Sequence, residues 1–297
     1  MNITSFGVGN MGSAIARRLL QAGHAVTAYD RSKEQAARLA VNGAQIAASP
    51  REAVAGAEIV ITSLIGDQSV LDSVDGADGF LESMPEGAIH LCVTTISSAC
   101  ANRLAEMHAA ANTRFIAGPV VGRPDSAASG QLTTYLAGDS SAIAEVMQIM
   151  PAYTKKAIPV GGEAGLASAM KLSINYTAIS LIELMGEIYA FAEKSGIDRD
   201  LLFNHFTEAF NSPAIKGYAK KLRDHETSGE NGFAMTTGLK DVKLMIDAAD
   251  GVGVDFAIGR IARRKLEKAI DSGMGDSDWS AISQVTRVEA GCTKALG

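Results

Sequence analysis

The sequence predicts an α/β N-terminal domain built on a mostly parallel, doubly wound β-sheet, followed by an all-α C-terminal domain joined to it by a long interdomain helix. Three observations lead to this prediction. Short β-prone runs alternate with helical stretches as far as about residue 160, and a glycine-rich turn follows the first run. Beyond about residue 162 convincing β runs disappear, and residues 163–194 read as one helix without an internal proline. We therefore expect domains at residues 1–162 and 163–297.

The expected elements follow from local patterns. The run 59–64 is almost continuously apolar and β-branched, which is typical of a strand buried on both faces of a parallel sheet. Other strands are expected at 2–6, 25–29, 88–93, 113–117, 133–137 and 156–160. Beyond the long helix, further helices are expected at about 199–210, 214–224, 236–250, 256–272 and 277–290, with Lys265 among the basic residues of a solvated face.

Composition excludes several classes of protein. A net charge of −6 and a pI of about 5.4 give no strongly basic face, so we expect no nucleic-acid partner. The most apolar stretch, 174–191, carries Asn175, Glu183 and Glu187, so we expect a buried helix and no membrane span. The cysteines are three in number and scattered, which predicts no metal site and favours a reducing, cytoplasmic location.

A GxGxxG motif, GVGNMG, lies between the first strand and the first helix. Gly7 permits a tight turn, Gly9 lets the backbone approach a pyrophosphate, and Gly12 allows close packing of helix on strand. The helix N-terminus then offers free N–H groups to the phosphates. This context, with Tyr29-Asp30 ending the second strand at the right separation, predicts a Rossmann domain that binds a dinucleotide. Within the motif, Asn10 and Met11 are also expected to contact the cofactor.

The residues after the second strand leave the choice of cofactor open. Asp30 can accept hydrogen bonds from the ribose diol of NAD. Arg31 and Ser32 follow directly and suit the 2′-phosphate of NADP, although they also fit a solvent-facing arginine and a helix cap. We expect NAD or NADP, without a choice between them.

The segment GVGNMGSAIARRLLQAGHAVTAYDRS resembles the opening GxGxMGxxxAxxLxxxGxxVxxxD/N of the β-hydroxyacid dehydrogenase family, and the resemblance extends over nearly the whole chain. Members include 3-hydroxyisobutyrate dehydrogenases and tartronate semialdehyde reductases, and the related imine reductases share the architecture. Residues 92–97, CVTTIS, are similar to the family's Ser-Thr-Ile turn beside the nicotinamide. This implies that Thr95 contacts cofactor or substrate, whereas a plain strand-end turn fits its sequence equally well. Leu64 is expected beside the cofactor as well.

The segment GPVVGRPDSAASGQLTTYLAG resembles the family's DAPVSGG…AxxGxLxxxxGG. Val121 stands where the acid dehydrogenases have a carboxylate-binding serine. Arg123 stands where the family motif has the second of the two glycines that follow this serine. Val121-Gly122-Arg123-Pro124 is more similar to imine reductases. We expect Val121, Gly122 and Arg123 to contact the substrate, with Arg123 either binding an acid or bracing the loop.

The segment GLASAMKLSIN, residues 165–175, resembles the family's catalytic GxGxxxKxxNN, which implies that Lys171 is the catalytic lysine and Asn175 the second asparagine. Ala167 and Ile174 depart from the motif. Lys171 and Asn175 are four residues apart and share one face of a helix. An apolar setting disfavours the charged form of Lys171 and makes it a usable proton donor and acceptor. Lys240 and Asp241 resemble the family's Lys-Asp pair, which implies contact with cofactor and substrate.

These observations predict an NAD(P)-dependent oxidoreductase acting on the CH–OH group of a small β-hydroxyacid or the corresponding semialdehyde. An NADPH-dependent imine reductase is the alternative, supported by the Val121–Pro124 segment and opposed by Lys171. A non-catalytic dinucleotide-sensing protein is the third hypothesis. The long helix is apolar nearly all round, so a second copy is expected to cover it. The resemblance implies the same, a homodimer or homotetramer.

Overall fold

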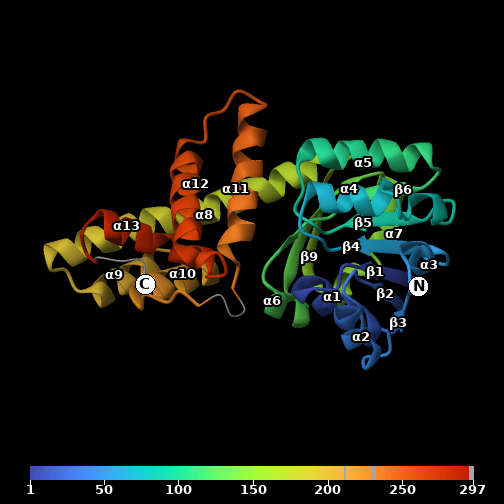
Figure 1. Ribbon diagram of the computed structural model, residues 1–297, viewed down its shortest axis with the longest axis horizontal. Coiled ribbons are helices and arrows are strands. Elements are labelled where there is room, and N and C mark those ends of the chain that lie inside the picture. The colour runs from blue at the N-terminus through green and yellow to red at the C-terminus, as the bar shows by residue number, and fades with distance from the viewer. Residues whose placement is uncertain (211, 229–231, 294–297) are drawn as a thin grey trace. The chain divides into compact units, whose positions relative to one another are not determined.

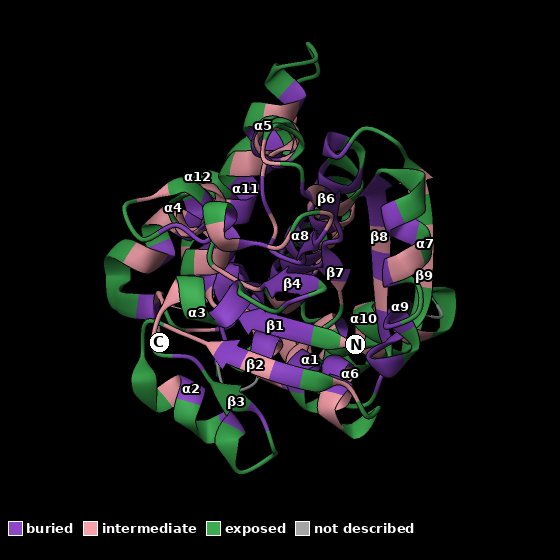
Figure 2. Ribbon diagram, turned by 90° about the vertical axis from the view of Figure 1, so that its right-hand side faces the viewer, coloured by how far each residue is buried: buried purple, intermediate pink, exposed green. Residues whose placement is uncertain are grey.

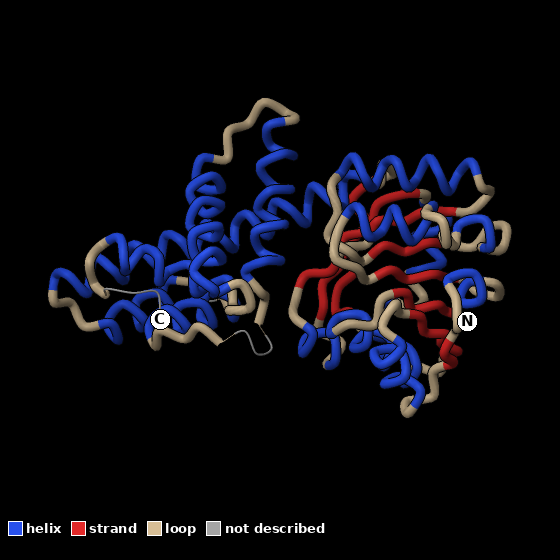
Figure 3. The backbone as a smooth tube through the Cα atoms, in the orientation of Figure 1, coloured by secondary structure: helices blue, strands red, loops and turns tan. Residues whose placement is uncertain are grey.

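The computed structural model describes residues 1–210, 212–228 and 232–293. The chain divides into two compact units, Met1–Lys171 and Leu172–Gly297. Within the described residues all named strands belong to the first unit, and the second is built from helices (Figures 1 and 3). The predicted combination of an α/β part and an all-α part is confirmed.

The sheet of the first unit has the spatial order β3-β2-β1-β4-β5-β6-β8-β7, with β9 paired to β8. The strands from β3 to β6 run parallel, whereas β8 is antiparallel to β6 and β7. Because the chain order reverses between β1 and β4, the crevice at their carboxyl ends is where ligands bind in sheets of this kind. The bounds are β1 Asn2–Phe6, β2 Ala25–Tyr29, β3 Gln45–Ile46, β4 Ile59–Thr62, β5 Ile89–Cys92, β6 Arg114–Ala117, β7 Val120–Val121, β8 Leu132–Gly138 and β9 Thr154–Gly161.

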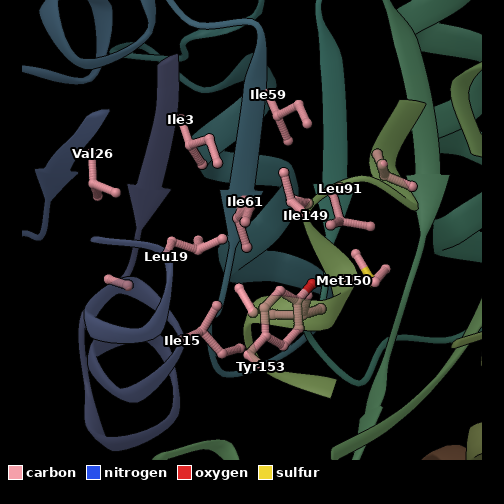
Figure 4. Close-up of a cluster of buried hydrophobic side chains, with 14 of the residues drawn as sticks. Ile3, Ile15, Leu19, Val26, Ile59, Ile61, Leu91, Ile149, Met150 and Tyr153 are labelled. Atoms are coloured by element: carbon pink, nitrogen blue, oxygen red, sulfur yellow. Dashed lines mark hydrogen bonds between the residues drawn. The ribbon is translucent and has the colours of Figure 1, made fainter. Parts of the chain in front are cut away.

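Helices cover both faces of this sheet, and one apolar cluster lies on each. The first cluster joins inward-facing strand residues to α1, α2, α6 and α7 (Figure 4). The second joins the opposite strand faces to α3, α4, α5 and the start of α8. As a result β4 is buried along its whole length (Figure 2). These helices are α1 Asn10–Gln21, α2 Lys33–Ala40, α3 Pro50–Val54, α4 Asp67–Asp75, α5 Ser98–Ala110, α6 Pro124–Ala128 and α7 Ser140–Val146.

The second unit is organised around α8, Gly165–Ser195, whose first residues belong to the first unit. Its 31 residues correspond to a length of about 46 Å. One side of α8 packs into a third apolar cluster with the later helices. These are α9 Arg199–Ala209, α10 Pro213–Arg223, α11 Met235–Asp250, α12 Ala257–Ala269 and α13 Ser283–Glu289.

Two local expectations for the second unit are wrong. The single helix expected at 277–290 is divided into a 3₁₀ helix, Trp279–Ile282, and α13. The buried Asp278 carboxylate accepts from the Ser280 amide and hydroxyl and fixes the first of these turns. Lys265 is only 4% exposed: its ammonium group pairs with Glu183 of α8 and donates to Thr286 of α13 at 2.8 Å.

Candidate active site

The glycine-rich turn lies between β1 and α1, at the carboxyl end of β1. Gly7 has φ +85°, and a Cβ there would lie 2.5 Å from the Ser63 carbonyl oxygen after β4. A Cβ on Gly12 would lie 2.0 Å from the Gly7 carbonyl oxygen. A Cβ on Gly9 would meet nothing within 4 Å, and no side chain caps α1. Gly7 and Gly12 are therefore required for packing, whereas Gly9 borders open space at an uncapped helix N-terminus.

Asp30, directly after β2, braces this turn. Its Oδ2 accepts from the Val8 amide and its Oδ1 from the Ser32 amide, both at 2.9 Å. The hydroxyl of Ser32 accepts from the Gln35 amide at 3.4 Å and caps α2. Arg31 is exposed and has no hydrogen-bond or ion-pair partner among the residues that the structure describes, so its guanidinium is available to an anion.

Two hydrogen-bonded connections join the loops that follow β4 and β5. The hydroxyl of Thr94 accepts from the Leu64 amide at 2.8 Å and donates to the Thr62 carbonyl at 3.2 Å. The carboxylate of Asp67, at the start of α4, accepts from the Ser97 amide at 2.9 Å and from its hydroxyl at 2.5 Å. Thr95 lies between these two anchors, so the loop that the family resemblance predicts beside the nicotinamide is held at both ends.

A chain of buried hydrogen bonds supports the end of β4. Thr62, His90, His108 and Thr113 are joined by three side-chain hydrogen bonds of 2.8 Å each. The Thr113 hydroxyl donates to the His108 carbonyl, so the chain is satisfied if each ring carries its proton on Nδ1. Burial lowers the pKa of His90 well below 6.5, helped by repulsion from His108, and burial lowers that of His108 to about 4. Both rings are therefore neutral near pH 7.

Lys171 and Asn175 lie one turn apart on α8, as the sequence predicts. Lys171 is half-buried and Asn175 is buried. The Asn175 amide donates to Oδ2 of Asp241 on α11 at 2.7 Å. The ammonium group of Lys240 lies 2.6 Å from Oδ1 of the same carboxylate. Asp241 is only 1% exposed, so its carboxylate interacts with these two side chains and not with bulk water.

The segment after β6 carries the remaining predicted residues. Val121 ends β7 and is half-buried. Gly122 has φ +134°, and a Cβ there would lie 2.6 Å from a methyl carbon of Leu132, which explains the glycine. Arg123, half-buried, immediately precedes α6.

The structure thus groups the predicted residues within each unit. The first unit brings Gly7–Gly12, Leu64 and Thr95 to the carboxyl edge of the sheet, and the second joins Asn175, Lys240 and Asp241. Sequence reasoning missed Asp67, Thr94 and Ser97, because hydroxyl and carboxyl groups in loops give no signal until their partners, about 30 positions away, are known.

The cradle around Gly9 fits a dinucleotide. Its open space, the uncapped N-terminus of α1 and the fixed position of Asp30 are what a pyrophosphate and an adenosine ribose require. Elsewhere, no group of three or more metal-ligating side chains that could hold an ion occurs in the described parts of the chain. Among the helices of those same parts, none has the length and apolar character needed to cross a membrane.

Comparisons with known proteins agree with this geometry. Residues 2–162 match the family model of the NAD binding domain of 6-phosphogluconate dehydrogenase, and residues 165–286 match that of NADP-dependent 3-hydroxyisobutyrate dehydrogenase. An uncharacterized oxidoreductase of Bacillus subtilis, YfjR, is 36% identical over 95% of this chain and 98% of its own. Glyoxylate/succinic semialdehyde reductase 1 of Arabidopsis thaliana is 27% identical over 97% and 99%. A 3-hydroxyisobutyrate dehydrogenase structure from Mycobacterium tuberculosis, with L-serine, superposes with a TM-score of 0.86 at 26% identity, covering 96% and 99%.

Proposed function

The chain belongs to the β-hydroxyacid dehydrogenase family of NAD(P)-dependent oxidoreductases, and on this premise we propose that it interconverts a small β-hydroxyacid and its semialdehyde. The observation that carries the proposal is the pair Lys171 and Asn175 on one face of α8, with the Asn175 amide fixed by the buried Asp241. A protein that only sensed dinucleotides would have no use for this arrangement.

When bound, the nicotinamide supplies or accepts the hydride. The backbone at Gly7, Gly9 and Gly12, with Asn10 and Met11, would hold the pyrophosphate. Asp30, Arg31 and Ser32 would face the adenosine ribose, and Leu64 and Thr95 the nicotinamide end. The two anchors around Thr95 keep that loop in place without rearrangement, which is the preorganisation that a hydride transfer needs.

Lys171 is proposed as the general acid and base. In reduction its Nζ donates a proton to the carbonyl oxygen as the carbonyl carbon becomes an alcohol carbon. In oxidation the same atom removes the hydroxyl proton. One N–H of the Asn175 amide donates to Asp241 and fixes the orientation of the side chain. The second N–H of the same amide would orient the substrate oxygen.

Lys240 and Asp241 are proposed to support this site. The carboxylate of Asp241 accepts from Asn175 and pairs with Lys240, so it acts on the substrate through both side chains. Lys240 carries a positive charge suited to the cofactor. Val121, Gly122 and Arg123 would contact the rest of the substrate, with the Arg123 guanidinium suited to a carboxylate.

The test of the catalytic proposal is Lys171→Ala. Because general acid–base catalysis contributes about 10²–10⁴-fold, we expect kcat to fall by about a thousandfold while NADPH binding, followed by fluorescence titration, changes less than twofold. Lys155→Ala, which removes an exposed lysine at the start of β9, is the matched control and leaves kcat unchanged. A near-normal kcat in Lys171→Ala contradicts the assignment.

A substrate panel identifies the reaction. Glyoxylate, succinic semialdehyde, 3-hydroxyisobutyrate and a cyclic imine, each assayed with both cofactors, separate carbonyl from imine chemistry. Turnover of the imine that survives Lys171→Ala favours the imine reductase alternative suggested by Val121-Gly122-Arg123-Pro124. Cofactor binding without turnover of any compound favours a sensing role.

The remaining proposals concern organisation and setting. We place the functional division of the chain between residues 162 and 163, just before α8 begins. A cytoplasmic location is supported by its three free cysteines, Cys92, Cys100 and Cys292. A homodimer, or a tetramer built from two such dimers, is supported by the apolar residues that one copy leaves exposed on α8.

A further inference from the structure

The first turn of α8 is attached to the first turn of α5 by side chains from α5. Oδ1 of Asn102 accepts from the Gly165 amide at 2.7 Å, and its Nδ2 donates to the Glu163 carboxylate at 2.8 Å. The Ser98 hydroxyl donates to the Gly165 carbonyl at 2.9 Å. The N-terminal amide of α8, which has no partner within its own helix, is thus satisfied by a residue 63 positions earlier.

Close packing backs these polar contacts. Ala164 and Ala167, on either side of Gly165, are buried in the same apolar cluster as Cys100 and Ala101 of α5. A Cβ on Gly165 itself would lie 2.9 Å from Oδ1 of Asn102 and 3.1 Å from the Ser98 backbone oxygen. The two helices are therefore so close here that a methyl group would require the Asn102 side chain and the Ser98 backbone to shift by a few tenths of an ångström.

The same turn of α5 is attached to the loop that carries Thr95. Ser97 caps α5 by accepting from the Cys100 amide at 3.0 Å, and both its amide and its hydroxyl donate to Asp67. The polypeptide runs from Thr95 through Ser97 to Asn102, and the side chain of Asn102 is hydrogen-bonded to Gly165. Six residues after Gly165, in the same helix and the same compact unit, comes Lys171.

We propose that Asn102 is a positioning residue, which with Ser98 fixes the start of α8 and thereby the place of Lys171 relative to the Thr95 loop. This inference rests on the proposed function, because it requires Lys171 to be the proton donor. Six residues of helix span about 9 Å, so a tilt of about 6° at Gly165 displaces Lys171 by about 1 Å. A misplacement of about that size costs roughly a hundredfold in rate.

The test compares Asn102→Ala with the double variant Asn102→Asp/Glu163→Gln and with Asn42→Ala. Asn102→Ala removes the acceptor for the Gly165 amide. The double variant exchanges the amide and the carboxylate between positions 102 and 163, so it keeps both this acceptor and a donor–acceptor pair at the second contact. Asn42 provides the matched control, since its side-chain oxygen accepts from exposed Arg17 and touches neither α5 nor α8. The readouts are hydrogen–deuterium exchange of residues 163–172 in the cofactor-free protein, NADPH affinity, and kcat with NADPH and succinic semialdehyde.

For Asn102→Ala we expect faster exchange at residues 163–172 and a kcat lower by about tenfold or more, with NADPH affinity within about twofold of the parent. Asn102→Asp/Glu163→Gln keeps kcat within about threefold of the parent, and Asn42→Ala changes none of the three measurements. Parental exchange at residues 163–172 in Asn102→Ala overturns the proposal, whether or not succinic semialdehyde proves to be a substrate. If Lys171→Ala is inactive while Asn102→Ala has parental kcat, the positioning role fails and the proposed function stands.

A second variant tests the close approach without removing a hydrogen bond. Gly165→Ala adds one methyl group at the contact, so the Asn102 side chain and the Ser98 backbone must shift by a few tenths of an ångström. We expect faster exchange at residues 163–172 and a loss of kcat smaller than that of Asn102→Ala. Gly217→Ala on α10 is the matched control, because a Cβ there meets nothing within 4 Å. Parental kcat and exchange in Gly165→Ala show that the contact does not set the position of Lys171.

Discussion

The glycines of the turn between β1 and α1 differ in their physical surroundings. A methyl group on Gly12 meets a backbone oxygen at 2.0 Å, which no side-chain rearrangement can relieve. A methyl group on Gly9 points into open space, at a φ of −62° that any residue adopts. The two positions therefore separate folding from cofactor binding.

We predict that Gly12→Ala destabilises the protein by about 2 kcal/mol or more, as overpacking does elsewhere. Gly9→Ala should change the free energy of unfolding by less than about 0.5 kcal/mol but lower NADPH affinity by roughly tenfold, because its methyl group occupies the approach of the pyrophosphate. Urea unfolding and fluorescence titration give the two quantities. Parental NADPH affinity in Gly9→Ala shows that the turn does not hold the phosphates.

We expect the residues after β2 to decide cofactor preference. Asp30 already accepts two backbone hydrogen bonds, yet each carboxylate oxygen retains a second lone pair for a ribose hydroxyl. Exposed Arg31 suits a 2′-phosphate. We therefore expect both NADPH and NADH to bind, with modest discrimination.

Arg31→Ala should weaken NADPH by about tenfold, the worth of one hydrogen bond to a charged group, and leave NADH unchanged. Arg38→Ala is the matched control, because Arg38 lies on α2, the helix that follows Arg31, and its guanidinium donates to the Gln35 side chain. Isothermal titration with each cofactor measures the difference. An unaltered NADPH affinity in Arg31→Ala excludes Arg31 as the phosphate ligand.

At the scale of single elements, the His90–His108 chain gives the first unit a dependence on acid. Both pKa values are lowered from 6.5 by burial, so the folded state favours neutral rings. Their contribution to stability is complete above pH 6.5 and is lost as pH falls, for His108 down through about 4. For His108 this amounts to about 3 kcal/mol.

The free energy of unfolding should therefore decrease more steeply between pH 6.5 and 4 in the parent than in His108→Gln, because glutamine at position 108 does not titrate. His205→Gln, which replaces an exposed histidine on α9, should retain the parental slope. Urea unfolding at half-unit pH intervals measures the slopes. Identical slopes for His108→Gln and the parent contradict neutral burial of the pair.

Local patterns in the sequence predicted the elements whose burial leaves a periodic signal. The strands β1, β2 and β4 are found where apolar runs predicted them. In contrast, β3 and β7 have two residues each, too few for any period, and exist because neighbouring strands offer partners. Lys265 was predicted on a solvated face because its partner Glu183 lies 82 positions away.

At the scale of the whole molecule, the predicted site follows the same rule. The glycine-rich turn is a local motif, and its geometry was predictable. Lys171 and Asn175 were assigned from the resemblance to the family's motif, and helical spacing placed them on one face of a helix. The Asp67–Ser97 and Asn102–Gly165 contacts join loops and helix ends that are 30 and 63 positions apart. The local sequence around either partner does not predict these contacts, because they form only once the sheet has brought the segments together.

The assembly of the protein follows from α8. One side of this helix packs against α9–α13, with Ile179, Ile182 and Met185 buried. Positions 177, 184 and 191 are seven residues apart, so they share one face of the helix. All three are exposed, and Leu184 and Phe191 retain 50% and 67% of their surface. Position 177 is a threonine, so the exposed apolar surface of this face is that of Leu184 and Phe191, and a second copy of the chain would cover it.

We predict that a second copy provides this cover and that the protein is a two-fold dimer or a tetramer of dimers. Light scattering after gel filtration at micromolar concentration should give at least twice 30.9 kDa. Phe191→Glu places a charge in the proposed interface and should shift the population toward the monomer, because an unpaired charge is costly to bury. Val252→Glu, at an equally exposed apolar residue in the turn after α11, should leave the mass unchanged. A parent that elutes as a 30.9 kDa species would mean that α8 is exposed to water along this face, and the burial argument would be wrong.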